Sequence, residues 1–185
     1  MLVPRAGYPG SLPKSQLSSP VLDGTSLCQA VGDFEHTLCH RGMTYLVSRR
    51  YSSVANGNAA DMLFLTGASV ATHVVIVAVG SLAYIDFYDN PTFANTGTAT
   101  GAVALNQQVG GTPAFQAWGG PTLIQPGAAM YNGLLPTTGL RVVGPERGEC
   151  WTLAPGTYYY LAVTNQSGAT AAFEIQCWLY EETIV

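Results

Sequence analysis

The stretch from Cys150 to Glu181 constrains the fold most, because it predicts three consecutive β-strands separated by two turns. Ala154-Pro155-Gly156 marks the first turn, since proline fixes φ near a turn value and glycine accepts positive φ. Asn165-Gln166-Ser167-Gly168 marks the second turn. Between them, the run from Thr157 to Thr164 holds three tyrosines together with Leu161 and Val163, a content that suits a pleated sheet.

The last of these segments alternates in the way expected of a strand with one face toward a core. The residues expected to face inward are Ala171, Phe173, Ile175, Cys177 and Leu179. The aromatic residues with the opposite parity across the stretch are Tyr158, Tyr160, Trp178 and Tyr180. If they project outward, they could form a subunit interface or a sugar-stacking platform, whereas the alternative places half of them in the core. Glu181 and Glu182 are expected to form a solvated strand end.

Strand signals are continuous from Met43. The segment from Met43 to Val54 alternates and is followed by Asn56-Gly57, a strong signal for a hairpin or tight turn. Short apolar runs then predict strands covered on both faces, and weaker candidates follow. These segments are Ala60 to Thr66, His73 to Val79, Leu82 to Tyr88, the surroundings of Val103 and Leu105, Thr122 to Ile124, Ala129 to Leu135 and Leu140 to Val143.

This pattern predicts eight to ten short strands and no segment with a convincing helical period. Turn signals every 8 to 12 residues or so argue for a β-sandwich, of which the jelly roll is a common form. The Gly-rich middle, from Thr92 to Gly120, is expected to form long loops, which often carry binding surfaces. We therefore expect an all-β, jelly-roll-like sandwich over residues 43–185.

Residues 1–42 are expected to form an extended N-terminal arm and a connecting segment. Residues 1–27 are rich in proline, glycine and serine and show no helical or strand period, which favours an extended arm; a disordered tail is the alternative. A solvated tail would not need the apolar residues that this stretch contains. An arm that drapes over a neighbouring subunit explains them better, and these anchors are Leu2, Val3, Tyr8, Leu12, Leu17, Val21 and Leu22.

The chain is unusually poor in charge, with 10% charged residues against about 25% in a typical soluble domain. Such a surface suits a protein packed against others or an extracellular β-domain. The net charge of −4, with no basic cluster beyond Arg49-Arg50, argues against nucleic acid as a partner. No window approaches roughly eighteen consecutive apolar residues, so no membrane span is expected. The N-terminus also lacks the pattern of a signal peptide.

The four cysteines, Cys28, Cys39, Cys150 and Cys177, permit three pairings. Cys150 and Cys177 lie on neighbouring predicted strands and could meet. The lack of an export signal favours free, buried thiols instead. Cys28, His36, Cys39 and His40 match no standard zinc spacing, and we interpret this segment as a loop or edge strand.

The sequence predicts no enzyme, no cofactor and no metal site. It contains no G-x-S-x-G, H-E-x-x-H or phosphate-binding glycine loop. Asp86 and Asp89 fall on opposite faces of a predicted strand, so they cannot form the carboxylate pair of a glycosidase there. Asp89 and Asn90 could offer oxygens to calcium, but Asx before proline is ordinary turn chemistry. His73 begins a predicted core strand, where a structural role is expected.

Several short motifs are distributed over about residues 43 to 181. They are Tyr51-Ser52-Ser53-Val54-Ala55-Asn56-Gly57, Thr66-Gly67 after an apolar strand, His73, Phe87-Tyr88-Asp89-Asn90-Pro91-Thr92, Trp151-x-Leu153-x-Pro155-Gly156-Thr157-Tyr158, Val163-Thr164-Asn165-x-Ser167-Gly168 and Trp178-x-Tyr180-Glu181. Their combination resembles the jelly-roll decoration, or cement, proteins of tailed-bacteriophage capsids. Residues 1–42 and the Gly-rich middle lie outside the resemblance.

The resemblance implies a non-enzymatic virion protein, assembled in the host cytoplasm, that sits on the capsid exterior and stiffens the shell. Its expected partners are the major capsid protein and further copies of itself, as a homotrimer rather than a dimer, with neither nucleic acid nor membrane. No site residues carry over from the family. The candidate interface therefore consists of the arm anchors named above together with Trp178 and Tyr180. The alternative is a tail or head-fibre module that binds host-surface glycans through residues 89–120 and exposed aromatics; a glycan-active enzyme is a weaker third possibility.

Overall fold

The computed structural model describes residues 41–109, 111–137, 139–143 and 151–183. The predicted arm lies outside the described residues, so its boundary and its role remain predictions. The same holds for several residues singled out above: Leu2, Val3, Tyr8, Leu12, Leu17, Val21, Leu22, Cys28, His36, Cys39, His40 and Cys150.

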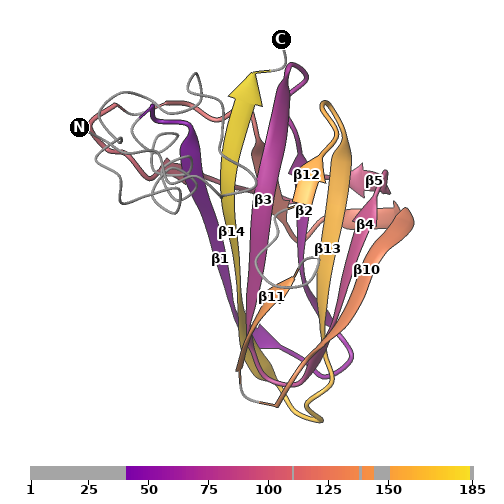
Figure 1. Ribbon diagram of the computed structural model, residues 1–185. Helices are drawn as coiled ribbons and strands as arrows, with labels where there is room; N and C mark the ends of the chain where they lie inside the picture. Colours follow the sequence, from indigo (N-terminus) through magenta and orange to yellow (C-terminus); the bar gives the residue numbers. More distant parts are fainter. Residues whose placement is uncertain (1–40, 110, 138, 144–150, 184–185) are drawn as a thin grey trace, which may run out of the picture.

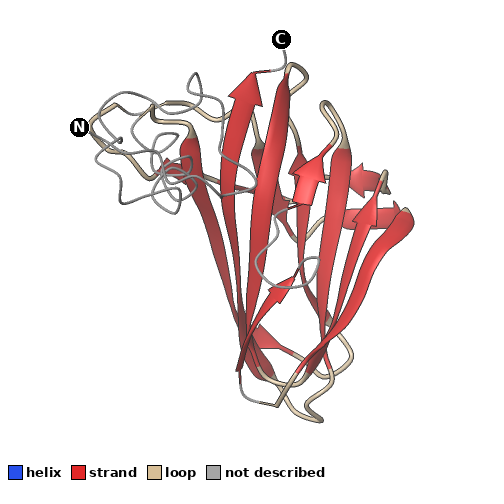
Figure 2. Ribbon diagram, viewed as in Figure 1, coloured by secondary structure: helices blue, strands red, loops and turns tan. Residues whose placement is uncertain are grey.

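The described chain is all-β, as the sequence predicts, and its strands form a sandwich of two antiparallel sheets (Figures 1 and 2). The first sheet has the order β11-β3-β14-β1-β7, and β12 pairs with β3 beside β11. Its strands are β1 (Thr44–Val54), β3 (Val70–Gly80), β7 (Ala102–Ala104), β11 (Gly139–Val143), β12 (Trp151–Leu153) and β14 (Ala171–Thr183).

The second sheet has the order β10-β4-β13-β2-β8-β6, and a separate two-stranded sheet is formed by β5 and β9. The strands of the second sheet are β2 (Ala59–Leu65), β4 (Ala83–Asp89), β6 (Thr98–Thr100), β8 (Gln116–Gly119), β10 (Ala128–Leu135) and β13 (Tyr158–Asn165). The small sheet joins β5 (Thr92–Asn95) to β9 (Thr122–Gln125).

The strand pairing is nested. The first four strands pair in reverse order with the later ones: β1 with β14, β2 with β13, β3 with β11 and β12, and β4 with β10. Because β1 to β4 alternate between the two sheets, β14 lies between β1 and β3, and β13 lies between β2 and β4. Strands far apart in the sequence therefore form the centre of each sheet.

The main core fills the space between the two sheets. The predicted inward residues of β14 are confirmed, since Phe173, Ile175, Cys177 and Leu179 are all buried. The Cys177 thiol is free, and burial raises its pKa. Phe87 of β4 is buried in this core and stacks on Tyr159, with ring centroids 5.8 Å apart.

Two predicted turns depend on glycine as expected. Gly57 follows Asn56 with a φ of 81°, and Gly156 follows Pro155 with a φ of 61°, a region that residues with a Cβ rarely adopt. Each turn also bonds to a distant part of the backbone: the Gly57 amide donates to the Asn165 carbonyl at 2.8 Å, and the Gly156 amide donates to the Gly67 carbonyl at 3.1 Å.

The expectation of long loops from Thr92 to Gly120 is wrong. This segment contains β5, β6, β7 and β8, each three or four residues long, and the described chain has fourteen strands in place of eight to ten. Its Gly and Ala residues have weak strand propensity. They become strands because an adjacent strand supplies hydrogen bonds in register, as β2 does for β8.

Candidate functional site

The outer face of the first sheet carries a row of apolar side chains that crosses four strands. Val103 of β7 pairs with Leu46 of β1, Leu46 pairs with Trp178 of β14, and Trp178 pairs with Val75 of β3. Val103 is 56% exposed and Trp178 is 44% exposed. At about 4.8 Å between strands, the row is roughly 14 Å wide. We call this surface, with Tyr180, the open face.

A stacked aromatic pair borders the open face on one side. The rings of His73 and Tyr180 have centroids 4.4 Å apart and planes 8° apart. The His73 Nδ1 atom lies 3.2 Å from the Thr152 hydroxyl, and its Nε2 lies 3.8 Å from a carboxylate oxygen of Glu182. His73 was expected on a core strand and does lie on β3, but its side chain is on the outer face because its parity is opposite to that of the buried Val74.

Polar side chains border the other side of the open face. The Glu174 carboxylate accepts hydrogen bonds from the Ser48 hydroxyl at 3.1 Å and from the Gln176 amide at 2.7 Å. These two bonds, together with the nearby charge of Arg50, hold the pKa of Glu174 below its ordinary value. The open face thus has an apolar centre and a polar rim, the composition typical of a protein-binding surface.

The outer face of the second sheet is different, because the β5–β9 sheet covers part of it. A second apolar cluster lies there, with Leu63 fully buried and Tyr160 and Ala162 nearly so. Phe93 of β5 contacts Tyr158 edge to face, with centroids 4.8 Å apart. All four aromatic residues singled out in the sequence therefore point away from the main core, but only Trp178 and Tyr180 remain on an uncovered face.

Hydrogen bonds around Asp61 of β2 join Tyr160 of the covered face and Tyr51 of the main core to this strand. The Tyr160 hydroxyl donates to the Asp61 carboxylate at 3.2 Å, and the Tyr51 hydroxyl donates to the Asp61 backbone carbonyl. Burial raises the pKa of Asp61, and the hydrogen bond from Tyr160 opposes that shift. Burial also raises the pKa of Tyr51 and of Tyr160. The guanidinium of Arg49 lies 5.4 Å from the centre of the Tyr51 ring. This arrangement gives hydrogen-bond partners to the partly buried polar groups of Tyr51, Asp61 and Tyr160.

Glu181 corrects a second expectation. It is buried, not solvated, and its two carboxylate oxygens accept hydrogen bonds from the backbone amides of Ala114 and Phe115 at 2.9 and 2.6 Å. The alternation of β14 continues through this residue, so Glu181 points inward while Glu182 is exposed. Counting two residues past Leu179 would have found this position from the sequence.

Within the described residues, no group of three or more His, Cys, Asp and Glu side chains could hold a metal ion. Asp86 accepts a hydrogen bond from the Asn132 amide at 2.6 Å. Asn90 has a φ of 50° and donates its amide to the Tyr158 carbonyl at 2.9 Å, which is the behaviour of a turn residue. In the same part of the chain, no helix has the length and apolarity needed to cross a membrane.

No protein-family model matches this sequence, and no curated protein matches it. Among solved structures, the chain is similar to a hydroquinone 1,2-dioxygenase from Sphingomonas sp. TTNP3 with 4-hydroxybenzoate bound. The identity is 14% and the TM-score is 0.27, with 76% of this chain and 61% of that chain covered. The chain thus spans 61% of the length of that structure. So low a TM-score supports no conclusion about function.

Proposed function

We propose that this protein is a structural component of a tailed-phage virion, a decoration protein that binds the assembled major capsid protein through its open face. The observation that carries the proposal is the apolar row centred on Trp178, which no other described element covers. An exposed apolar surface with a polar rim is characteristic of a protein-binding site. Trp and Tyr are also the residues most often dominant in binding energy.

We further infer that the sandwich is a jelly roll. The nested pairing supports this, because a long antiparallel ribbon folded over once brings its first and third strands together around its last strand, as β1 and β3 flank β14. The motif resemblance points to the same family of capsid proteins. The low charge, 10% of residues, suits a protein that spends its life packed on a lattice.

The proposed activity is thermodynamic and not enzymatic. A protein that contacts two neighbouring capsid subunits binds the assembled shell and not the free subunit, so binding stabilises the shell by mass action. Repetition on the lattice, and self-association into a homotrimer, add avidity to contacts that are individually modest. The site of action is the capsid exterior, and neither nucleic acid nor membrane takes part.

The test is binding to purified shells. The protein should sediment with assembled empty shells and not with unassembled capsid subunits. Trp178→Ser should weaken that binding at least about 10-fold, because a central aromatic anchor is lost. Tyr84→Ser is a matched control, since Tyr84 is 53% exposed on the opposite sheet. Shell binding that is unchanged by Trp178→Ser, or equal for both variants, would contradict the proposed docking face.

A second candidate function is a fibre module that binds host-surface glycans. One observation favours it: on the part of the second sheet beyond β5 and β9, exposed Tyr84 pairs with exposed Leu134, and the bonded Asp86–Asn132 pair lies next along the same strands. An aromatic face beside a carboxylate and an amide can stack on a sugar ring and bind its hydroxyls. Glycan-array binding that Tyr84→Ser abolishes, without retention on shells, would favour this function over decoration.

A further inference from the structure

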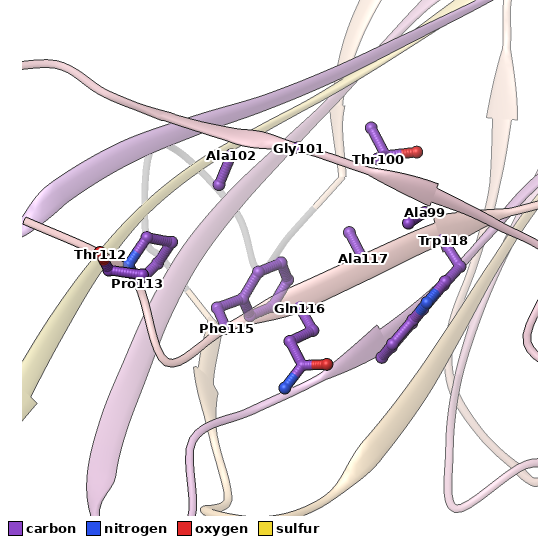
Figure 3. Close-up of a pocket in the computed structure, with 10 residues that line it drawn as sticks. All are labelled: Ala99, Thr100, Gly101, Ala102, Thr112, Pro113, Phe115, Gln116, Ala117 and Trp118. Carbon is purple, nitrogen blue, oxygen red and sulfur yellow. The ribbon is translucent and has the colours of Figure 1, made fainter.

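An apolar groove lies where the two sheets separate along one edge of the sandwich. The chain leaves β6 of the second sheet at Thr100 and enters β7 of the first sheet at Ala102, so one wall of the groove crosses between the sheets. The other wall is the segment from Thr112 to Trp118. The volume is about 300 Å³, and every lining residue is uncharged. Figure 3 shows Phe115 and Ala117 directed into the space, with Ala102 facing them.

The second wall of this groove is held firmly. Glu181 accepts hydrogen bonds from the amides of Ala114 and Phe115, so a charged group inside the sandwich fixes the backbone of this wall. The Phe115 ring packs on Phe64 of β2, with centroids 5.5 Å apart. The groove is therefore preformed, and a ligand would not need to order it.

The strands at the edge of the groove carry no charged residue and no proline. Val103 of the open face, Leu105 and Val109 are exposed by 56%, 39% and 56%, and they follow the lining residue Ala102 along the chain. The edge strands β6 and β7 consist of Ala, Thr and Val alone. Edge strands that must stay unpaired usually carry charges or proline, because their free backbone groups otherwise pair with another chain. This edge is suited to receive another segment of polypeptide.

The described chain begins next to this groove. A Cβ placed on Gly42 would lie 3.2 Å from Val109 Cγ1, and one placed on Gly111 would lie 2.7 Å from the Gly42 carbonyl oxygen. The loop at Val109 and Gly111 leads directly into the Thr112–Pro113 wall. Forty residues precede Arg41, and the first 27 contain apolar side chains separated by proline, glycine and serine. A segment of matching chemistry is therefore attached to the chain at the mouth of the groove.

We propose that the groove binds an apolar stretch of residues 1–27 donated by a second copy of this chain. A segment with Leu12 and Leu17 near its centre would bury these side chains against Ala102, Phe115 and Ala117. Donation between copies would link neighbouring decoration subunits, so the inference extends the proposed function and rests on it for its biological meaning. The contact itself needs no capsid and can be tested without one.

The first experiment measures self-association of the full chain by analytical ultracentrifugation over a range of concentrations. Ala99 is an exposed lining residue, so Ala99→Arg places a charged side chain at the mouth of the groove with little expected effect on folding. We expect it to raise the concentration for half-association at least about 10-fold. The double substitution Leu12→Ser with Leu17→Ser should do the same. The matched control is Ala55→Arg, at an exposed turn position remote from the groove, which should associate like the unmodified chain.

The second experiment identifies the donor. Two full-length variants are prepared, Leu12→Cys with one affinity tag and Gln116→Cys with another. The two variants are then mixed and mildly oxidised. A disulfide that joins the two tags is expected, and each single-cysteine population alone controls for the native cysteines. A further variant carries Leu12→Cys and Gln116→Cys in the same chain. If the disulfide forms within this chain at high dilution and never between the two tagged populations, donation between copies is overturned. Association that ignores Ala99→Arg would overturn the groove as the site. If Trp178→Ser abolishes shell binding while the cross-link persists, the two proposals are independent.

Discussion

The strands β13 and β14 lie at equivalent places in the two sheets, but the outer face of β13 is covered and that of β14 is exposed. Both lie between two long neighbours, and both direct aromatic side chains away from the main core. Around β13, Tyr158 and Tyr160 are packed beneath β5 and β9, with Leu63 at the centre of a second apolar cluster. Around β14, no described element covers Trp178, which remains 44% exposed.

The difference shows how a chain with few charged residues divides its apolar surface. Covering the face of β13 with its own β5–β9 sheet contributes to folding stability, since apolar area leaves water within one molecule. Leaving the face of β14 open contributes nothing to the isolated protein. It retains the same kind of surface for a partner, and this contrast is the physical basis for proposing the open face as a docking site.

The largest expected effect comes from removing a leucine on each face. Leu63→Ala should lower the free energy of unfolding by about 2–5 kcal/mol, because Leu63 is fully buried and leaves a cavity. Leu46→Ala, on the half-buried row of the open face, should cost about 1 kcal/mol or less. Urea unfolding of both variants measures the difference. Equal losses would mean that the two faces are equally covered in solution.

A second contrast separates the inner and outer sides of β14. Glu181→Gln should lower the free energy of unfolding by about 1–3 kcal/mol. The glutamine side chain has one oxygen in place of two, so its NH₂ group would face one of the two backbone amides that now donate to Glu181. The negative charge that strengthens both hydrogen bonds is also lost. Glu182→Gln is the matched control at the next residue, where the side chain is exposed and a change within about 0.5 kcal/mol is expected. If both variants unfold alike, the Glu181 carboxylate is not buried in solution.

Much of this arrangement follows from local pattern. The alternation from Phe173 to Leu179 identifies the inward face of β14, and Asn56-Gly57 identifies a turn, because both depend on the residues themselves. The cover over Tyr158 and Tyr160 does not follow from such patterns. It depends on β5 and β9 pairing across 26 intervening residues and settling on the second sheet.

The open face was only half predictable for the same reason. The parity of β14 places Trp178 and Tyr180 outward, but the register that aligns Trp178 with Leu46, Val103 and Val75 arises from three separate strand pairings. The outward position of His73 could not be predicted because an apolar run conceals which parity faces the core. The short strands from Thr92 to Gly120 were not predicted because the many Gly and Ala residues of this segment give little local signal.

A third, smaller effect concerns high pH and the covered face. Burial raises the pKa of Tyr160 above its ordinary value of 10.0, so above about pH 10 the unfolded chain releases this proton while the folded chain keeps it. The folded state then binds more protons, and its stability is full below pH 10 and falls as the pH rises toward the folded pKa. One such group contributes a slope of up to about 1.4 kcal/mol per pH unit.

Tyr160→Phe should therefore make the free energy of unfolding fall less steeply between about pH 10 and 11, even though the lost hydrogen bond to Asp61 costs about 1 kcal/mol at neutral pH. Urea unfolding at closely spaced pH values gives both quantities. Tyr51, whose pKa burial also raises, keeps part of the slope in the variant. An unchanged slope would show that solvent reaches Tyr160, and hence that the β5–β9 cover opens readily.

The smallest effect on stability is expected at Trp178 in the open face. The same residue should give the clearest change in the accessibility of tryptophan to a quencher. Trp178→Ser should change the free energy of unfolding by no more than about 0.5–1 kcal/mol, since the side chain is 44% exposed and its cross-strand neighbours Leu46 and Val75 are only half-buried. Trp118 and Trp151 are half-buried, so acrylamide should quench the fluorescence of Trp178 most strongly. The variant should lose that quenchable component, and the unmodified protein should lose it on binding to shells. If shell binding leaves the quenching of Trp178 unchanged, the partner contacts another surface, and the contrast between the covered and the open face has a different cause.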